Sequence, residues 1–262
     1  MPAKLMGVVN VTPDSFSDGG LYLDPEAAIA HGEELAAAGA AILDVGGEST
    51  RPGAEEVAEA EELRRVVPVI SGLAGSGAEV SVDTSKAAVA AAALDAGATI
   101  VNDVTALRGD PEMAALCAER GATVVLMHML GDPRTMQRDP SYTDVVAEVG
   151  AFLAERLQLA VAAGIAEERI WLDPGIGFGK TAEHNLELLR RLPELRRLGR
   201  PLVVGTSRKS FIGRLDGSPA SERLGGTIAS SVLAAAEGAE VLRVHDVAEV
   251  AEAMKLAGAV LG

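Results

Sequence analysis

The sequence predicts an α/β fold of the (β/α)8 barrel type, on three observations. Short apolar runs alternate with segments rich in Ala, Leu and Glu from one end of the chain to the other. Eight such runs in 262 residues give about 33 residues per unit, the size expected for this barrel. Runs such as Val124-Val125-Leu126-Met127 are apolar throughout, which is typical of parallel strands covered on both faces.

The strand candidates are rich in β-branched residues, and several end in a polar residue. They span residues 5–11, 41–45, 80–84, 99–104, 123–128, 170–173, 202–206 and 241–245. Apolar residues spaced by three and four predict helices between them, as at 25–38, 86–96, 145–163 and 184–192. We expect one domain over residues 1–262, and a doubly wound open sheet is the alternative fold.

Composition excludes several classes of protein. The chain carries 23 basic and 38 acidic side chains, a net charge of −15, whereas a nucleic-acid-binding protein needs a basic face. Cys117 is the single cysteine, so no intramolecular disulfide can form and a reducing cytoplasm is the expected compartment. No stretch approaches the roughly 18 apolar residues of a membrane span, and the start of the chain is too weakly apolar for a signal peptide.

Polar residues stand at or just after the ends of seven strand candidates. In either α/β fold, ligands bind beyond the carboxyl ends of the strands, so these residues are the candidate site. Arg243 and His245 are two positions apart and should therefore face the same side of the last strand. A lone polar residue at a strand end can equally cap a helix or form a turn, and Ser85, Asp103 and Asp246 also fit that structural role.

Two sets of these side chains indicate the kind of ligand. Asp83, Asn102, Asp173 and Lys209 form a ring of in-plane donors and acceptors that suits a neutral heterocycle with amide and amidine edges. Arg51, Arg243 and His245 are cations that suit a diphosphate, and Arg243 could also stack on a ring. Mg2+ needs few protein ligands when a diphosphate supplies the others, so Asn10 could suffice as its protein ligand.

Other common site motifs are absent. The glycine-rich stretch at 175–181 fits neither a P-loop, because Pro174 stands where the first glycine is needed, nor the dinucleotide fingerprint, because its spacing is G-x-G-x-G. The four histidines show no zinc-site spacing, and His31 and His184 lie in helical stretches as expected surface or capping residues. No nucleophilic triad is apparent, and Cys117 is expected to be a small buried helix residue.

Taken together, these motifs resemble those of the dihydropteroate synthase family. The matching stretches are residues 7–20, 44–53, 82–86, 102–104, 172–181, 205–213 and 243–246. They run from the first strand candidate to the last, so the resemblance extends over the whole chain. The resemblance implies a single-domain (β/α)8 TIM barrel with its active site at the C-terminal ends of the strands. Leu130 departs from the family's usual MHMQG run after the fifth strand, which puts only a peripheral contact in doubt.

The resemblance implies a transferase of folate biosynthesis, a target of sulfonamides. It condenses 6-hydroxymethyl-7,8-dihydropterin diphosphate with p-aminobenzoate to give 7,8-dihydropteroate and diphosphate. Diphosphate leaves first, and the aniline nitrogen attacks the pterin methylene cation. Two alternatives are a methyltetrahydrofolate-dependent methyltransferase-like barrel, which has no need of Thr50-Arg51-Pro52, and a non-catalytic pterin-binding barrel, which degraded loops would mark.

The resemblance also implies roles for individual residues. The expected pterin-binding residues are Asp83, Asn102, Val104, Met127, Asp173, Phe178, Gly205, Lys209 and Arg243. The p-aminobenzoate site would comprise Phe16, Thr50, Arg51, Pro52 and Ser210, and the diphosphate site Asn10, Arg51, Arg243 and His245. Asp83, Lys209, Arg243, His245 and Arg51 would act in catalysis, Asn10 would bind the Mg2+ cofactor, and the chain would form a homodimer.

Overall fold

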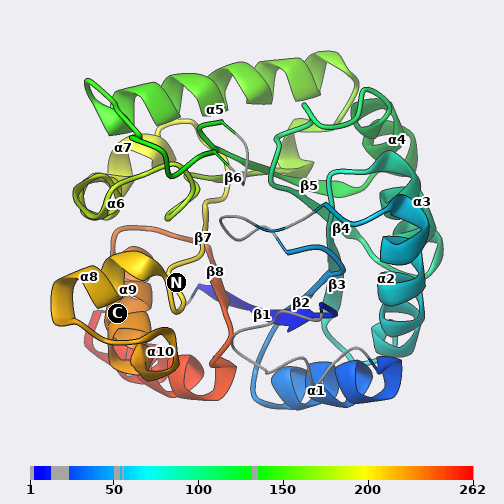
Figure 1. Ribbon diagram of the computed structural model, residues 1–262, viewed down its shortest axis with the longest axis horizontal. Helices are drawn as coiled ribbons and strands as arrows, with labels where there is room; N and C mark the ends of the chain where they lie inside the picture. The colour runs from blue at the N-terminus through cyan, green and yellow to red at the C-terminus, as the bar shows by residue number, and fades with distance from the viewer. Residues whose placement is uncertain (1–2, 13–23, 50–53, 55, 132–134, 262) are drawn as a thin grey trace.

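The computed structural model describes residues 3–12, 24–49, 54, 56–131 and 135–261. Eight parallel strands form one sheet in the order β6-β5-β4-β3-β2-β1-β8-β7. A bridge between Leu172 and Leu202 connects the two outer strands, so the sheet closes into a barrel. Figure 1 shows the helices as a ring outside the strands. The predicted (β/α)8 barrel is confirmed, and the doubly wound alternative is wrong.

The elements alternate along the chain as predicted. The strands are β1 (Lys4–Asn10), β2 (Ile42–Gly46), β3 (Glu79–Asp83), β4 (Ile100–Asp103), β5 (Thr123–Met127), β6 (Ile170–Asp173), β7 (Val203–Val204) and β8 (Val241–Val244). The helices are α1 (Pro25–Ala37), α2 (Glu59–Leu73), α3 (Ala87–Asp95), α4 (Met113–Arg120), α5 (Val145–Ala162), α6 (Ala182–Arg190), α7 (Leu192–Arg196), α8 (Ser210–Asp216), α9 (Leu224–Ala236) and α10 (Val247–Leu261). Short 3-10 turns stand at Glu167–Arg169 and Ala220–Glu222.

Two predicted elements differ from the observed bounds by more than one residue at an end. The strand expected at 202–206 is shorter, because the backbone N–H of Lys209 donates to the carbonyl of Thr206 at 3.2 Å and closes a turn there. The helix expected at 184–192 begins earlier, at Ala182, and ends at Arg190. Pro193 then occupies the first turn of a separate α7, where its missing N–H costs no helical hydrogen bond.

Alternation along the strands separates two apolar layers. Inside the barrel, one cluster comprises Met6, Ile42, Ile100, Val125, Val203 and Val241. Outward-facing residues of the same strands, such as Val9 and Leu43, belong to the larger cluster that includes the helices. Positions two or four residues beyond the inner cluster therefore face inward above it, and many of these carry polar groups.

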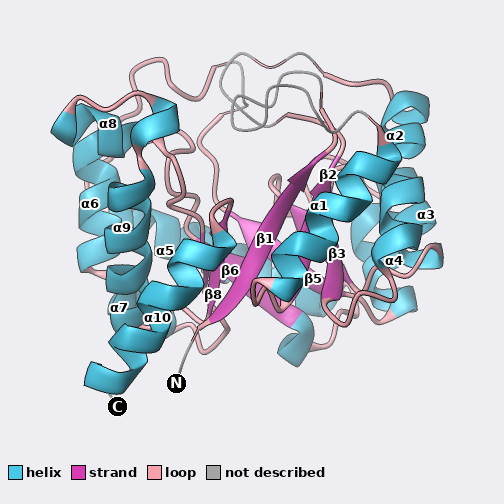
Figure 2. Ribbon diagram, turned by 90° about the horizontal axis from the view of Figure 1, so that it is seen from below, coloured by secondary structure: helices cyan, strands magenta, loops and turns pink. Residues whose placement is uncertain are grey.

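This geometry places the candidate site at one end of the barrel. Figure 2 shows β1, β2 and β3 inclined in the same direction, as parallel strands of one barrel must be. Their carboxyl ends meet at a single rim. Within the described part of the chain, no helix has both the length and the apolar character needed to cross a membrane.

Candidate active site

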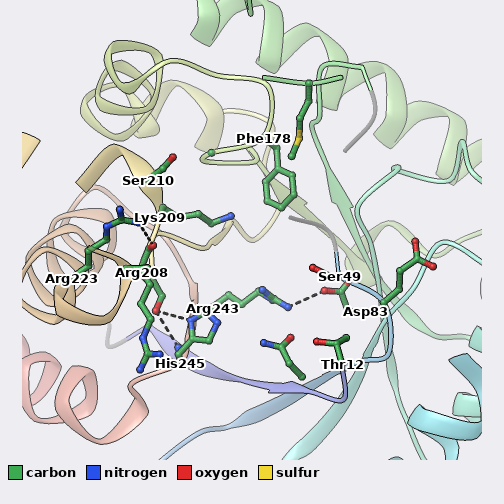
Figure 3. Close-up of a pocket in the computed structure, with 16 residues that line it drawn as sticks. Thr12, Ser49, Asp83, Phe178, Arg208, Lys209, Ser210, Arg223, Arg243 and His245 are labelled. Carbon is green, nitrogen blue, oxygen red and sulfur yellow. Dashed lines mark hydrogen bonds and ion pairs between the residues drawn. The ribbon is translucent and has the colours of Figure 1, made fainter. Parts of the chain in front are cut away.

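A cavity of about 290 Å³ opens at this rim, and Figure 3 shows the side chains that line it. We call it the outer cavity. A smaller inner cavity adjoins it among the strand ends and shares six of its lining residues. The shared residues are Asp83, Phe178, Ser207, Lys209, Arg243 and His245.

The inner cavity collects the residues expected to bind a pterin. All nine line it, although they come from six strands and the segments that follow them: Asp83, Asn102, Val104, Met127, Asp173, Phe178, Gly205, Lys209 and Arg243. Asn10, Arg243, His245 and Ser210, which are expected at the diphosphate and p-aminobenzoate sites, line the outer cavity. Phe16, Thr50, Arg51 and Pro52 lie outside the described residues.

Arg243 forms the centre of a buried charge network. Its Nε donates to Oδ2 of Asp44 at 2.6 Å, and its Nη2 donates to Oδ2 of Asp83 at 2.9 Å. Asn102 Nδ2 donates to the same Asp44 oxygen at 3.0 Å. Asp44 is completely buried, and its other oxygen, Oδ1, has no hydrogen-bond partner among the described residues. The sequence indicates Asp44 only as a polar strand end, so its contact with Arg243 is a new finding.

The two acids of the inner cavity are strongly affected by burial. Burial raises the pKa of Asp83 above its ordinary value, and the guanidinium of Arg243 partly offsets this. Burial also raises the pKa of Asp173, against the N–H of Gly175 and the ammonium of Lys209. For Arg243, burial lowers the pKa, but the carboxylates of Asp44 and Asp83 raise it above its ordinary value. Arg243 therefore stays charged, and a cationic ligand would favour ionisation of both acids.

Phe178 and Lys209 contact each other in the wall of the cavity. The Nζ of Lys209 lies 4.0 Å from the centroid of the Phe178 ring, a cation–π contact. Both side chains point into the cavity in Figure 3. Together they leave an apolar face and a donor close together, which suits a flat heterocycle with a carbonyl edge.

His245 is oriented by Ser207. The Ser207 hydroxyl accepts a hydrogen bond from the backbone N–H of His245 at 3.2 Å and lies 2.9 Å from its ring Nδ1. If the hydroxyl donates to Nδ1, the ring carries its proton on Nε2, which can then donate to an anion. The sequence places both residues at strand ends but does not predict their contact.

Two further arginines line the outer cavity, and no role is predicted for either. Arg208 has a left-handed backbone, with φ at 56°, and its guanidinium binds both carboxylate oxygens of Asp246. Arg223 donates through Nη1 to the carbonyl oxygen of Arg208 at 3.0 Å. Arg208 lies in the stretch at 205–213 that the sequence identifies as a motif. Arg223 lies at the start of α9, far from any strand end, so the search of strand ends could not find it.

A lysine bridge anchors the start of the loop after β2. Lys86 Nζ lies 2.5 Å from Glu48 and 2.6 Å from Glu62, and the Glu62 side chain is almost fully buried. Burial lowers the pKa of Lys86, but its bonds to the two glutamates raise it above its ordinary value. Arg65 also donates to the carbonyl of Gly47 at 2.8 Å. Residues 47 and 48, which lead into residues 50–53, are therefore bound to α2 and to the start of α3.

Several residues have the structural roles that the sequence allows. Asp103 accepts from the backbone N–H groups of Thr105 and Leu107, each at 2.8 Å, and so holds a turn. His184 completes a capping box with Thr181 at the start of α6. Cys117 is buried in α4, and burial raises the pKa of its thiol to about 12, so it stays a neutral apolar residue.

Comparison with known proteins identifies close relatives. The model of a family described as pterin binding enzymes matches residues 6–245. Dihydropteroate synthase of Escherichia coli (strain K12) is 50% identical over 258 residues, covering 98% of this chain and 91% of the relative.

Solved structures show the same similarity. The dihydropteroate synthase of Yersinia pestis, solved with a sulfonamide drug complex, has a TM-score of 0.96 and 47% identity, covering 99% of this chain and 94% of that one. The Xanthomonas albilineans enzyme in complex with 7,8-dihydropteroate has a TM-score of 0.88 and 48% identity, covering 98% and 93%.

Proposed function

The chain belongs to the dihydropteroate synthase family of pterin-binding enzymes, and we propose that its inner cavity binds the pterin and its outer cavity the diphosphate and p-aminobenzoate. Its reaction condenses 6-hydroxymethyl-7,8-dihydropterin diphosphate with p-aminobenzoate and yields 7,8-dihydropteroate and diphosphate. It is a transferase that acts on small molecules. The relatives described above are dihydropteroate synthases, so they favour neither the methyltransferase nor the non-catalytic alternative.

The observation that carries the pterin assignment is the lining of the inner cavity. Asp173 and Asp83 offer carboxylate acceptors for the pterin N–H groups, and Asn102 offers an amide with both donor and acceptor. Lys209 can donate to the ring carbonyl, with Phe178 and Met127 as apolar contacts. Hydrogen bonds to a heterocycle in this position would offset the desolvation penalty of these buried polar groups.

Arg243 and His245 would bind the diphosphate at the junction of the two cavities. Both line each cavity, so they can reach an anion carried on the pterin methylene group. Arg51, the third cation proposed for this site, lies outside the described residues. A fixed cation is needed here because the net charge of −15 gives no long-range attraction for an anion.

The residues present fit a Mg2+ ion that is shared with the diphosphate. Asn10 places one hard amide ligand in the outer cavity beside Arg243 and His245. The described residues contain no group of three His, Cys, Asp or Glu side chains able to hold a metal by themselves, so phosphate and water oxygens would complete the coordination. When bound, Mg2+ would neutralise negative charge on the leaving diphosphate.

The chemistry that we propose needs charge stabilisation more than a base. The bond between the methylene carbon and the diphosphate oxygen breaks, and both electrons leave with the diphosphate. Arg243 and His245 stabilise that anion, while the carboxylates of Asp83 and Asp173 stabilise the positive charge spread over the pterin. The aniline nitrogen is neutral at about pH 7, attacks the methylene carbon and then releases its proton to water.

For p-aminobenzoate, we propose a site formed by Phe16, Thr50, Arg51 and Pro52 together with Ser210. Ser210 is the first residue of α8 and lines the outer cavity, directly after Lys209. The aniline nitrogen would then approach the methylene carbon from the outer cavity, with the pterin beneath it.

Turnover of the two substrates tests the function. Purified protein should form 7,8-dihydropteroate from the pterin diphosphate and p-aminobenzoate when Mg2+ is present. Removal of divalent ions with EDTA should reduce the rate at least tenfold, and added Mg2+ should restore it. The pterin alcohol, which has no leaving group, is the control and should give no product. Absence of product from the diphosphate with Mg2+ present would contradict the function, and full activity in EDTA would contradict the Mg2+ assignment.

We also propose that the protein is cytoplasmic and forms a homodimer. The lone buried Cys117 is compatible with a reducing compartment. Leu233 on α9 and Leu256 and Val260 on α10 are between 62% and 75% exposed on two helices that pack against each other, and such a face suits an isologous contact. Light scattering should give twice the monomer mass, and Leu256→Glu should shift it toward the monomer. A monomeric wild-type protein would contradict the dimer.

A further inference from the structure

Lys180 is a buried lysine outside the set of residues assigned above. Only 3% of its surface is exposed, and its Nζ lies 2.9 Å from each of three acceptors. These are the ring Nδ1 of His128 and the carbonyl oxygens of Gly175 and Phe178; the carbonyl oxygen of His128 is farther, at 3.5 Å. No carboxylate in the described ranges comes within ion-pair distance of Nζ.

The three contacts are compatible with two protonation states of this cluster. An ammonium group donates to all three acceptors, and His128 then accepts through Nδ1 and carries its proton on Nε2. A neutral amine donates to the two carbonyls and accepts from a protonated Nδ1. Burial and the nearby Lys180 charge lower the pKa of His128 to about 3, so the ring is neutral in both states. In the first state a buried cation is surrounded by neutral acceptors.

Lys180 holds the turn that carries Phe178. The two carbonyls that it binds belong to residues 175 and 178, and the backbone N–H of Phe178 also donates to the Gly175 carbonyl at 3.0 Å. Gly175 has a φ of 67°, and a Cβ added there would lie 1.9 Å from the carbonyl oxygen of His128. The backbone at Gly175 therefore packs directly against His128, the residue that follows β5, with no space for a side chain between them.

The same turn also positions Asp173. The backbone N–H of Gly175 donates to Oδ1 of Asp173 at 2.7 Å, so Lys180 binds the carbonyl of the residue that orients this carboxylate. Three cations act on Asp173 through charge alone and lower its pKa against burial, namely Lys209, Lys180 and Arg243. Lys180 is the only one of these three that does not line the inner cavity.

We propose that Lys180 is a positioning residue of the pterin site, whose ammonium group holds Phe178 and Asp173 in place through the turn between them. The proposal rests on the assignment of the inner cavity to the pterin. Lys180 touches no substrate in this scheme. It acts through the turn that it binds and through its charge.

The charge of Lys180 predicts a specific pH dependence of pterin binding. Burial lowers the pKa of Lys180 to about 7, while Asp173 raises it and Lys209 lowers it further. His128 faces Nζ from β5 as a neutral ring. Below about pH 7 the ammonium is present and supports an ionised Asp173; above it, the positive charge is lost and Nζ donates only to the two carbonyls. The advantage of the lysine for pterin binding should therefore be largest in acid and should decrease as the pH rises.

Lys180→Met removes the charge and the donors with little change in volume. Calorimetry with 6-hydroxymethyl-7,8-dihydropterin between pH 5.5 and 8.5 should show at least tenfold weaker binding at pH 6, and a smaller difference at pH 8.5. The ratio to wild type cancels the ionisation of the probe itself. In turnover, KM for the pterin diphosphate should rise at least tenfold, while kcat and KM for p-aminobenzoate change less than threefold.

Three further variants separate positioning from general stability. Lys180→Gln retains N–H donors without the charge and should bind with an affinity between those of wild type and Lys180→Met. Tyr142→Phe removes a neutral anchor of the same turn, the 2.8 Å hydrogen bond to the Gly179 carbonyl, and should not change the pH dependence. Lys255→Met makes the same substitution at an exposed lysine and should bind the pterin with wild-type affinity at every pH.

The outcomes distinguish this inference from the proposed function. A wild-type protein that fails to bind the probe would contradict the pterin assignment itself. A wild-type protein that binds it, with folded Lys180 variants of equal affinity or a difference independent of pH, would overturn the role of Lys180 alone. Loss of folding in both Lys180 variants would assign the residue to stability and would also overturn the proposal.

Discussion

The Nη2 of Arg243 lies 2.9 Å from Oδ2 of Asp83, although 160 residues separate them in sequence. β8 and β3 bring the two side chains together inside the barrel. The two carboxylates of Asp44 and Asp83 hold the guanidinium in one orientation, which lowers the entropic cost of placing it against a ligand.

Asp44 is expected to be the main support of that orientation. Asp44→Ala would leave Arg243 with one carboxylate in place of two and would leave Asn102 without its acceptor, and breaking a buried pair typically costs about 3 kcal/mol or more. Urea unfolding should show this loss of stability, and kcat/KM should fall at least tenfold in the folded fraction. The control is Asp95→Ala at an exposed pair with Arg120, which should leave the stability close to that of wild type. Equal effects of the two substitutions would show that Arg243 does not depend on Asp44.

Asp173 is expected to contribute to pterin affinity more than any cation does. Removing one member of a buried hydrogen-bonding set leaves its partners unpaired, at a cost of about 1 to 3 kcal/mol. Asp173→Ala should therefore weaken the binding of a pterin without diphosphate by roughly tenfold or more, measured by calorimetry. Arg243→Met, tested with the same probe, should have the smaller effect. Unchanged affinity in a folded Asp173→Ala protein would remove Asp173 from the site.

The barrel and the polar ring are predictable from sequence because they follow from local rules. Apolar runs predict buried parallel strands, and a period of two places Arg243 and His245 on one face. The network partners are not predictable in this way. Arg223 reaches the cavity from a helix start, and Lys180 reaches its acceptors through a turn of three glycines with positive φ. Both depend on tertiary packing, for which the sequence offers no periodic signal.

Lys86 is expected to affect the second substrate more than the first. Lys86→Met would leave the buried Glu62 without its counterion, at a cost of about 3 kcal/mol in unfolding free energy. It would also leave Glu48, at the start of the loop after β2, with only the backbone N–H of Val57 as a partner among the described residues. Because Thr50, Arg51 and Pro52 of the proposed p-aminobenzoate site come shortly after Glu48 in the sequence, KM for p-aminobenzoate should rise several-fold and pterin affinity should change little.

A double variant provides the control for Lys86. Lys86→Met combined with Glu62→Met removes both buried charges and should recover most of the lost stability without restoring KM for p-aminobenzoate. If KM recovers together with stability, Lys86 acts only on folding. Lys4→Met at the exposed pair with Glu79 should leave both quantities close to wild type.

His128 is expected to make the folded state sensitive to acid. Its pKa is lowered to about 3 in the folded protein, from an ordinary value of 6.5. Between these values the unfolded chain binds a proton that the folded chain excludes, so stability is lost as the pH falls through this window. By pH 4 the loss should be about 3 kcal/mol. His128→Asn keeps an acceptor for Lys180 but cannot titrate. Between pH 7 and pH 4, the unfolding free energy of this variant should therefore decrease by about 3 kcal/mol less than that of wild type. Urea unfolding at a series of pH values measures the difference, and parallel curves for the two proteins would show that His128 is protonated with equal ease in the folded and unfolded states.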